Sequence, residues 1–181
     1  LVRLEGECSR TIDQIRLFAT LAEKEEWKEI STEAAEPNRT PIPKPEMYKA
    51  NHPIGPVVVI GACNFPLAIS VVGTDTTSAL AVGCPVVVKS HPRHAQTCEL
   101  LADLVNQAKR ESNMPDGCFH LVHGESHGVS TALVSHPKTA CVAFTGSLQG
   151  GKDLYKVANA RPSPIPFHAE MGSLNPVFGL P

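Results

Sequence analysis

Four short apolar runs, each without alternating polar residues, are the feature that most constrains how this chain can fold. They begin after Pro53 and cover residues 57–60, 85–88, 118–122 and 141–144, and stretches with helical spacing of apolar residues separate most of them. Strands that are apolar on both faces are typical of parallel sheets with helices on either side. The alternation predicts an α/β fold, a doubly wound, Rossmann-like parallel sheet with right-handed crossovers and helices on both faces.

The stretches between these runs predict helices over residues 66–82, 100–108, 129–134 and 148–160, and a last extended segment follows at 166–169. In doubly wound sheets, ligands bind beyond the carboxyl ends of the strands. The residues that directly follow each apolar run are therefore the candidates for chemistry.

The residues before the first run have a different character. Residues 11–28 predict a helix, because Thr11-x-x-Gln14 has the form of a capping box and apolar residues recur on one face. That face consists of Ile12, Ile15, Ala19 and Ala22. The proline-rich residues 31–53 predict an extended connection or edge segment, since proline removes donors and blocks helix. We therefore expect two parts, residues 1–53 and a dinucleotide-binding domain over residues 54–181.

Composition and charge argue against several classes of function. The 181 residues have a formal net charge of -2 and no cluster of Lys and Arg, so we expect no nucleic-acid partner. No apolar run approaches the roughly 20 residues of a membrane-spanning helix, so we expect no membrane partner. The six scattered cysteines lack a C-x-x-C pair and indicate reduced core thiols in a cytoplasmic protein. The missing initiator Met and the abrupt end at Pro181 predict a piece of a longer protein.

The first strand end carries an amide side chain, Asn64, within Gly-Ala-Cys-Asn-Phe-Pro at residues 61–66. Gly61 permits a tight turn, and Pro66 suits the first position of a helix. The N–H donors of Asn64 could stabilise an oxyanion as a carbonyl becomes tetrahedral. The alternative is that Asn64 only caps the following helix.

Two further strand ends suit a nucleotide. Lys89 follows three valines and either binds a ribose or phosphate or marks where the strand reaches solvent. Residues 144–151, Phe-Thr-Gly-Ser-Leu-Gln-Gly-Gly, place a glycine turn and a hydroxyl at a helix start, where free N–H groups and the helix dipole favour a pyrophosphate. This string is neither G-x-G-x-x-G nor a P-loop, so generic motifs leave its role open.

The last candidate is Glu170, between a short apolar stretch and Gly172. Held partly out of water, its carboxylate would have a raised pKa and act as a general base; the alternative is a structural glutamate in a salt bridge. Two histidine pairs are spaced three apart, but His120 and His123 would face opposite sides of a strand, and His91 and His94 lack a carboxylate or thiolate at ligand spacing. We therefore expect no metal site.

The residues of these motifs, and their order along the chain, resemble those of the aldehyde dehydrogenase superfamily. The resemblance rests on Ile-Gly-Pro at 54–56, Asn-Phe-Pro at 64–66, Val-Val-Val-Lys at 86–89, Phe-Thr-Gly-Ser at 144–147 and Glu-Met-Gly at 170–172. Residues 61–68, 88–92 and 164–176 are similar to the branch of α-ketoglutaric (2,5-dioxovalerate) semialdehyde dehydrogenases, which includes NADP-using members.

The resemblance implies roles for individual residues. Asn64 would be the oxyanion-hole amide and Glu170 the base that activates water to hydrolyse a thioester. The nucleophilic cysteine of the family would lie beyond Pro181, so the chain would lack the catalytic domain and be inactive alone. Residues in contact with NADP or NAD would come from three strand ends: Ala62, Phe65, Lys89, Pro92, Gly146, Ser147 and Gly151.

One departure bears on the cofactor. Pro92 lies where most NAD-preferring relatives carry a glutamate that binds the ribose hydroxyls. Because no carboxylate is present there to repel a 2′-phosphate, we expect NADP to be tolerated. The implied substrate is a small aldehyde, and the full-length protein is expected to be a homo-oligomer. Two alternatives stay open: a nucleotide-binding module without chemistry, and an acyl-phosphate or acyl-CoA reductase of the same superfamily. The second would not use a deacylating glutamate, so Glu170 argues against it.

Overall fold

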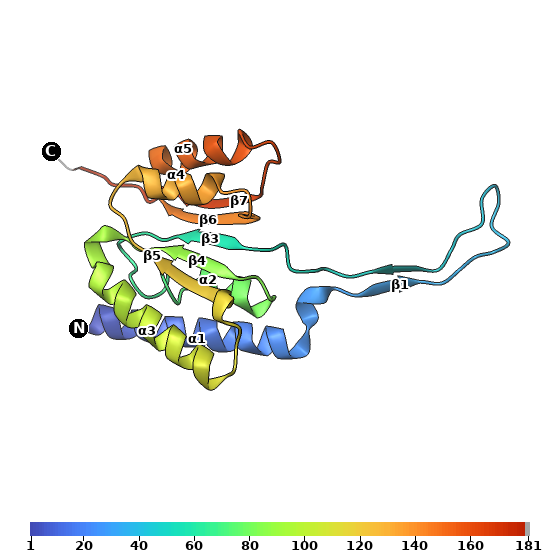
Figure 1. The fold of residues 1–181 in the computed structure, drawn as a ribbon, viewed down its shortest axis with the longest axis horizontal. Helices are drawn as coiled ribbons and strands as arrows, with labels where there is room; N and C mark the ends of the chain where they lie inside the picture. The colour runs from blue at the N-terminus through green and yellow to red at the C-terminus, as the bar shows by residue number, and fades with distance from the viewer. Residues whose placement is uncertain (180–181) are drawn as a thin grey trace.

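The computed structural model describes residues 1–179 as a body built on a five-stranded sheet, from which a long arm projects (Figure 1). All neighbouring strands of this sheet run parallel, in the order β5-β4-β3-β6-β7. The strands are β3 (Val57–Ile60), β4 (Val86–Lys89), β5 (Phe119–Val122), β6 (Cys141–Gly146) and β7 (Phe167–Met171). Each contains or overlaps one of the five extended segments expected from the sequence, and the doubly wound fold is confirmed.

Helices cover both faces of the sheet, with α1 to α3 on one side and α4 and α5 on the other (Figure 1). No helix within residues 1–179 is long and apolar enough to cross a membrane. The helices are α1 (Val2–Lys24), α2 (Thr74–Ala81), α3 (Ala95–Glu111), α4 (His127–Ser135) and α5 (Leu148–Asn159), with short 3-10 turns η1 (Glu26–Lys28), η2 (Pro92–His94) and η3 (Asp116–Cys118).

The central strand β3 is buried along its whole length, because it supplies both hydrophobic cores. Val57 and Val59 point into the core beneath α2 and α3, whereas Val58 and Ile60 point into the core beneath α4 and α5. Successive strand residues face opposite sides of a sheet, so a strand between two helical layers has no polar face. This is the physical origin of the apolar run without alternation.

The strand order places a topological switch at the centre of the sheet. From β3 the chain proceeds outward through β4 to β5, then returns to the other side of β3 and continues through β6 to β7. The loops that follow β3 and β6 therefore leave in opposite directions and open a crevice between them.

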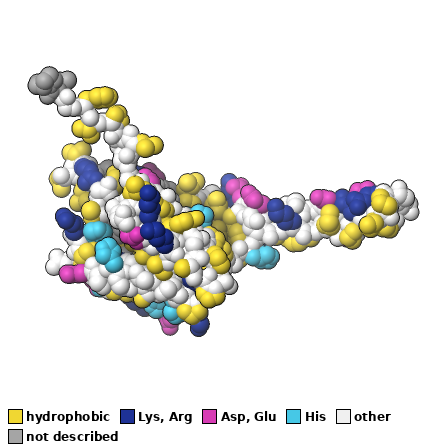
Figure 2. All heavy atoms as spheres, turned by 90° about the horizontal axis from the view of Figure 1, so that it is seen from above, with side chains coloured by type: hydrophobic (Ala, Val, Ile, Leu, Met, Phe, Trp, Pro, Cys, Tyr) yellow, Lys and Arg dark blue, Asp and Glu magenta, His cyan; other side chains and the backbone are white. Residues whose placement is uncertain are grey.

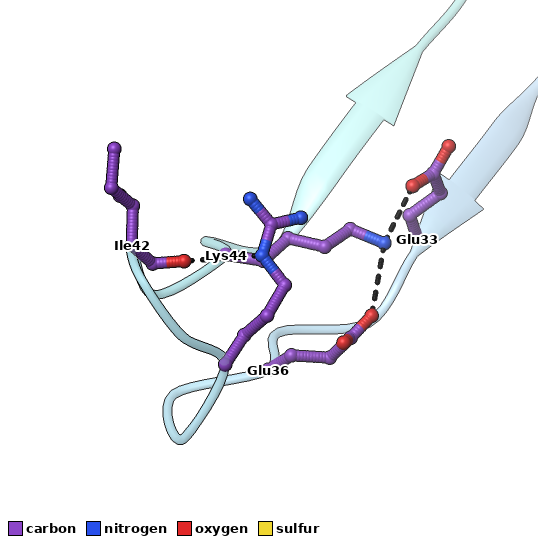
Figure 3. A network of polar contacts seen from close by, with 5 residues as sticks. Glu33, Glu36, Ile42 and Lys44 are labelled. Atoms are coloured by element: carbon purple, nitrogen blue, oxygen red, sulfur yellow. Dashed lines mark hydrogen bonds and ion pairs between the residues drawn. The ribbon is translucent and has the colours of Figure 1, made fainter.

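The arm comprises the antiparallel strands β1 (Ser31–Glu33) and β2 (Met47–Lys49), every residue of which is exposed. Figure 2 shows it extending away from the body, with acidic and basic side chains along it. Near its tip Lys44 Nζ lies 2.6 Å from Glu33 Oε2 and 3.3 Å from Glu36 Oε1 (Figure 3). The extended segment expected from the prolines is thus a hairpin. The division into residues 1–53 and 54–181 stays a prediction.

Two expectations about helices are wrong. The first helix begins at Val2 and ends at Lys24, and its buried residues are Glu7 and Thr11. Ile12 and Ile15 of the expected apolar face are 42% and 39% exposed. The polar face packs inward because it meets backbone N–H groups of a neighbouring loop that have no partner in that loop. Such groups need hydrogen-bond acceptors rather than apolar side chains.

The helix expected over residues 66–82 begins only at Thr74. Before it, the chain makes one tight turn, with Ile69 N–H donating to Phe65 O at 3.1 Å, and then folds back so that Thr74 N–H donates to Ala68 O at 3.1 Å. Gly73 occupies the N-cap position of α2. Asn64 therefore does not cap this helix, and that alternative is wrong.

Candidate active site

A cleft of about 730 Å³ lies at the carboxyl ends of the strands, across the topological switch. Its volume falls within the roughly 300–1,000 Å³ of small-molecule sites in proteins. Residues from the ends of all five strands line it. Among them are eight of the nine site residues expected from the sequence: Ala62, Asn64, Phe65, Lys89, Pro92, Gly146, Ser147 and Glu170.

The loop after β3 forms one wall of the cleft and carries Asn64. Gly61 starts the loop at a close approach to another backbone segment, since a Cβ atom there would collide with the backbone oxygen of Ile69. The turn from Phe65 to Ile69 then brings the chain back over the sheet. Asn64 is exposed and lines the cleft, so its side-chain amide can donate to a ligand there.

The end of β4 adds cationic and imidazole groups. Lys89 is the last residue of β4, in register with Ile60 on one side and Val122 on the other. Burial lowers the pKa of Lys89, and the nearby Cys98 raises it to a smaller extent. His91 Nδ1 accepts a hydrogen bond from Arg93 N–H at 3.2 Å and caps η2. Lys89 is thus half-buried at the cleft, where a bound phosphate would favour its charged form.

The end of β6 forms the opposite wall. Ser147 is the N-cap of α5, and its Oγ accepts a hydrogen bond from Gly150 N–H at 3.2 Å. Gly172 N–H donates to Gly146 O at 3.0 Å, which ties this turn to the segment after β7. The start of α5 therefore presents a hydroxyl and free helical N–H groups to the cleft, the arrangement that suits an anion.

Gly151 is the one expected site residue that does not line the cleft. It is buried against β7, where an added Cβ atom would lie 2.6 Å from Met171 Sδ. Its small size permits α5 to approach the sheet closely. Any contact of Gly151 with a cofactor stays a prediction, and packing accounts for a glycine here.

Glu170 lies on the edge strand β7, opposite Thr145 of β6. It lines the cleft but is exposed, so the partial burial expected from its apolar neighbours is not found. The reason is that β7 is the last strand of the sheet and has neighbouring structure on one edge only.

Asp75, in the first turn of α2, is an acidic group that sequence reasoning missed. Burial raises the pKa of Asp75, the negative charge of Glu170 raises it further, and His168 lowers it. The charge of Glu170 therefore acts on Asp75 although 95 residues separate them in the chain. The sequence holds no signal for this pairing, because it depends on how α2 packs relative to β7.

Sequence reasoning also missed the segment after β5. Glu125, Ser126, His127 and Ser130 line the cleft at the start of α4. These residues lie in the segment after the third apolar run, so the rule that sites lie beyond strand ends could have found them.

All six cysteines are free; Cys84, Cys98 and Cys141 are buried, whereas Cys8 and Cys63 are exposed and depart from the expected core position. Residues 1–179 contain no group of three or more His, Cys, Asp or Glu side chains placed to hold a metal ion.

A parallel, doubly wound sheet with a cleft at its switch point defines the Rossmann-like class of folds. This chain belongs to the aldehyde dehydrogenase family, whose sequence profile matches residues 2–180. It is 49% identical to α-ketoglutaric semialdehyde dehydrogenase 2 of Azospirillum brasilense and 45% identical to α-ketoglutaric semialdehyde dehydrogenase of Acinetobacter baylyi. Each alignment covers 100% of this chain and 34% of the relative, so the chain spans about a third of their length.

Solved structures agree on the fold. Methylmalonate-semialdehyde dehydrogenase of Oceanimonas doudoroffii superposes with a TM-score of 0.73 and 25% identity, over 94% of this chain and 31% of that protein. Glyceraldehyde-3-phosphate dehydrogenase of Methanocaldococcus jannaschii, solved with NADP, gives a TM-score of 0.73 at 23% identity, over 94% of this chain and 34% of that protein.

Proposed function

We propose that this chain forms the dinucleotide-binding part of an NAD(P)-dependent aldehyde dehydrogenase that oxidises α-ketoglutaric semialdehyde to the carboxylic acid. The observation that carries the proposal is the meeting of Asn64, Lys89, Ser147 and Glu170 at one cleft, from four different strands. The names of the two relatives at 49% and 45% identity support the substrate. The activity is assigned to a longer, homo-oligomeric protein.

The volume of the cleft and the residues that line it support the binding of a dinucleotide. Gly146 and Ser147, at the start of α5, would hold the pyrophosphate, and Lys89 would contact the adenosine ribose or its 2′-phosphate. Ala62, Phe65 and Pro92 would line the same site. When bound, the nicotinamide supplies the acceptor for a hydride.

In the proposed reaction, a cysteine thiolate outside this chain attacks the aldehyde carbon. The side-chain N–H of Asn64 donates to the oxygen that becomes negative. Loss of the hydride from this carbon leaves a thioester. Glu170 then takes a proton from water as the water oxygen attacks the thioester carbon, and the thiolate and the carboxylic acid are released. The exposed, cleft-lining position of Glu170 gives water free access to it.

Replacing Glu170 with Gln in the full-length protein tests this assignment. We expect a first burst of reduced cofactor to remain, because acylation needs no base at residue 170, and steady turnover to fall by about 100- to 10,000-fold. Glu23→Gln, an exposed carboxylate on α1 outside the cleft, is the control. Unchanged steady turnover in Glu170→Gln would remove Glu170 from the mechanism.

The cofactor preference is tested at Pro92. With no carboxylate there to repel a 2′-phosphate, the full-length protein is expected to bind NADP as well as NAD. Pro92→Glu should weaken NADP binding more than NAD binding, as measured by titration of intrinsic fluorescence. A strong preference of the unmodified protein for NAD would contradict the expectation.

A further inference from the structure

The buried carboxylate of Glu7 on α1 is the starting point. Glu7 is 6% exposed, and carboxylates are seldom buried without partners. Its Oε1 accepts hydrogen bonds from Leu67 N–H at 2.7 Å and Ala68 N–H at 3.0 Å. Both amides belong to the first turn after Phe65, where helical N–H groups have no partner within the turn itself. Because Glu7 is 60 residues away in the chain, this cap exists only through tertiary packing.

Two arginines on the same side of α1 contact the residues just before this turn. Arg3 Nη2 donates to Asn64 O at 2.5 Å, and its guanidinium lies 5.2 Å from the centre of the Phe65 ring. The guanidinium of Arg10 lies 5.7 Å from the same ring. Residues four apart on a helix share a face, so Arg3 and Glu7 act side by side. Together they bind the backbone of the loop at Asn64, Leu67 and Ala68.

We propose that Glu7 and Arg3 are positioning residues for the Asn64 loop, defined as residues 61–73. The inference rests on the proposed function, in which the Asn64 amide donates to the oxyanion. Arg3 holds the carbonyl of Asn64 itself, and Glu7 holds the turn that follows it, so the direction of the Asn64 side chain is set from α1. An oxyanion donor needs such support, because a displacement of about 1 Å can cost roughly 100-fold in rate.

Three variants of the full-length protein separate positioning from simple stabilisation. Glu7→Ala removes the acceptor of both amides, whereas Glu7→Gln keeps an oxygen that can accept them. Arg3→Ala removes the bond to Asn64 O from an exposed side chain, and we expect this variant to fold. The control is Glu5→Ala, an exposed acidic residue of the same helix.

Amide hydrogen exchange and steady-state kinetics are the two measurements. In Glu7→Ala we expect exchange of residues 64–69 to accelerate at least about 10-fold while β3 and β6 stay protected. We expect kcat for aldehyde oxidation to fall by about 10- to 100-fold with a smaller change in KM, and Glu7→Gln to recover most of it. Arg3→Ala should give a similar but weaker effect, and Glu5→Ala none.

Several results would overturn the inference. One is unchanged exchange of residues 64–69 in both Glu7→Ala and Arg3→Ala. Another is faster exchange with unchanged kcat, and a third is an equal loss in Glu5→Ala. If Glu7→Ala does not fold, Arg3→Ala decides by the same criteria. An unmodified protein without aldehyde oxidation would contradict the proposed function instead, and the exchange data would still decide whether α1 holds the loop.

Discussion

The two walls of the cleft are held in opposite ways. The turn after β6 is organised mainly by its own neighbours in the chain, since Ser147 Oγ accepts from the N–H of Gly150 three residues later, although Gly172 N–H also donates to Gly146 O. The loop after β3 is organised from a distance, by Glu7 and Arg3 of α1. One wall is thus a local motif, and the other exists only when α1 packs beside it.

This difference explains which wall could be recognised from the residues alone. A glycine turn followed by a hydroxyl at a helix start satisfies its own backbone donors, so the same string forms the same structure in many settings. The loop after β3 leaves backbone N–H groups unpaired, and an outside carboxylate must supply their acceptor. Local motifs tolerate change elsewhere in the molecule, whereas supported loops respond to substitutions far along the chain.

We expect the largest effect from a substitution at Gly61, where the loop after β3 begins. Gly61→Ala would place a Cβ atom against the backbone oxygen and carbon of Ile69, which cannot rotate away. We expect a loss of about 3 kcal/mol or more in the free energy of unfolding, at the upper end of overpacking costs. Urea unfolding monitored by circular dichroism measures it.

Gly6→Ala is the matched control for this change. Gly6 lies in α1 with nothing within 4 Å of an added Cβ atom. Because alanine favours helix over glycine, we expect a gain of about 0.5–1 kcal/mol. A loss at Gly61 no larger than the change at Gly6 would show that the first turn can shift without cost.

We expect a smaller effect on stability from a substitution in the turn after β6. Ser147→Ala removes the side-chain cap of α5, which typically costs about 1 kcal/mol. Ser126→Ala is the comparison, because Ser126 is the N-cap of α4 without a side-chain cap bond. We expect its effect to stay within about 0.5 kcal/mol. Equal losses at both serines in urea unfolding would mean that the Ser147 bond does not stabilise the turn.

The smallest effect is expected at the arm tip, where contacts are both local and exposed to solvent. The hydrogen bond and charge of Lys44 hold the pKa of Glu33 below its ordinary value of 4.5. Since the folded pKa is the lower one, the pair stabilises the hairpin above the ordinary pKa, and this contribution disappears as pH falls through the folded value.

Lys44→Met should return the pKa of Glu33 toward 4.5 without altering the unfolding of the sheet. Lys44→Arg keeps the charge and should keep the pKa low. Titration of the Glu33 carboxyl by NMR distinguishes these outcomes. A Glu33 pKa that does not move in Lys44→Met would show that the contact does not persist in solution.

Much of the fold could be predicted because its signals are local. Strand β3 was expected at the bounds that the structure has, and α5 within one residue, since buried strands and capped helices leave direct patterns in the chain. The start of α2 was missed because residues 66–73 have helical apolar spacing, but the chain folds back there so that Thr74 N–H donates to Ala68 O. The buried face of α1 was missed because it is polar, and apolar spacing pointed to Ile12 and Ile15 instead.

The sequence by itself determined the doubly wound sheet and the strand ends that line the cleft. Apolar runs without alternating polar residues must be covered on both faces, and a parallel sheet between two helical layers does this. Only the tertiary structure decided that Gly151 packs against Met171 outside the cleft, that Glu170 lies exposed on an edge strand, and that Asp75 approaches it. It also decided that Glu7 caps the loop of Asn64. These four depend on contacts between residues far apart in the chain or on the neighbours of an edge strand, for which local patterns carry no signal.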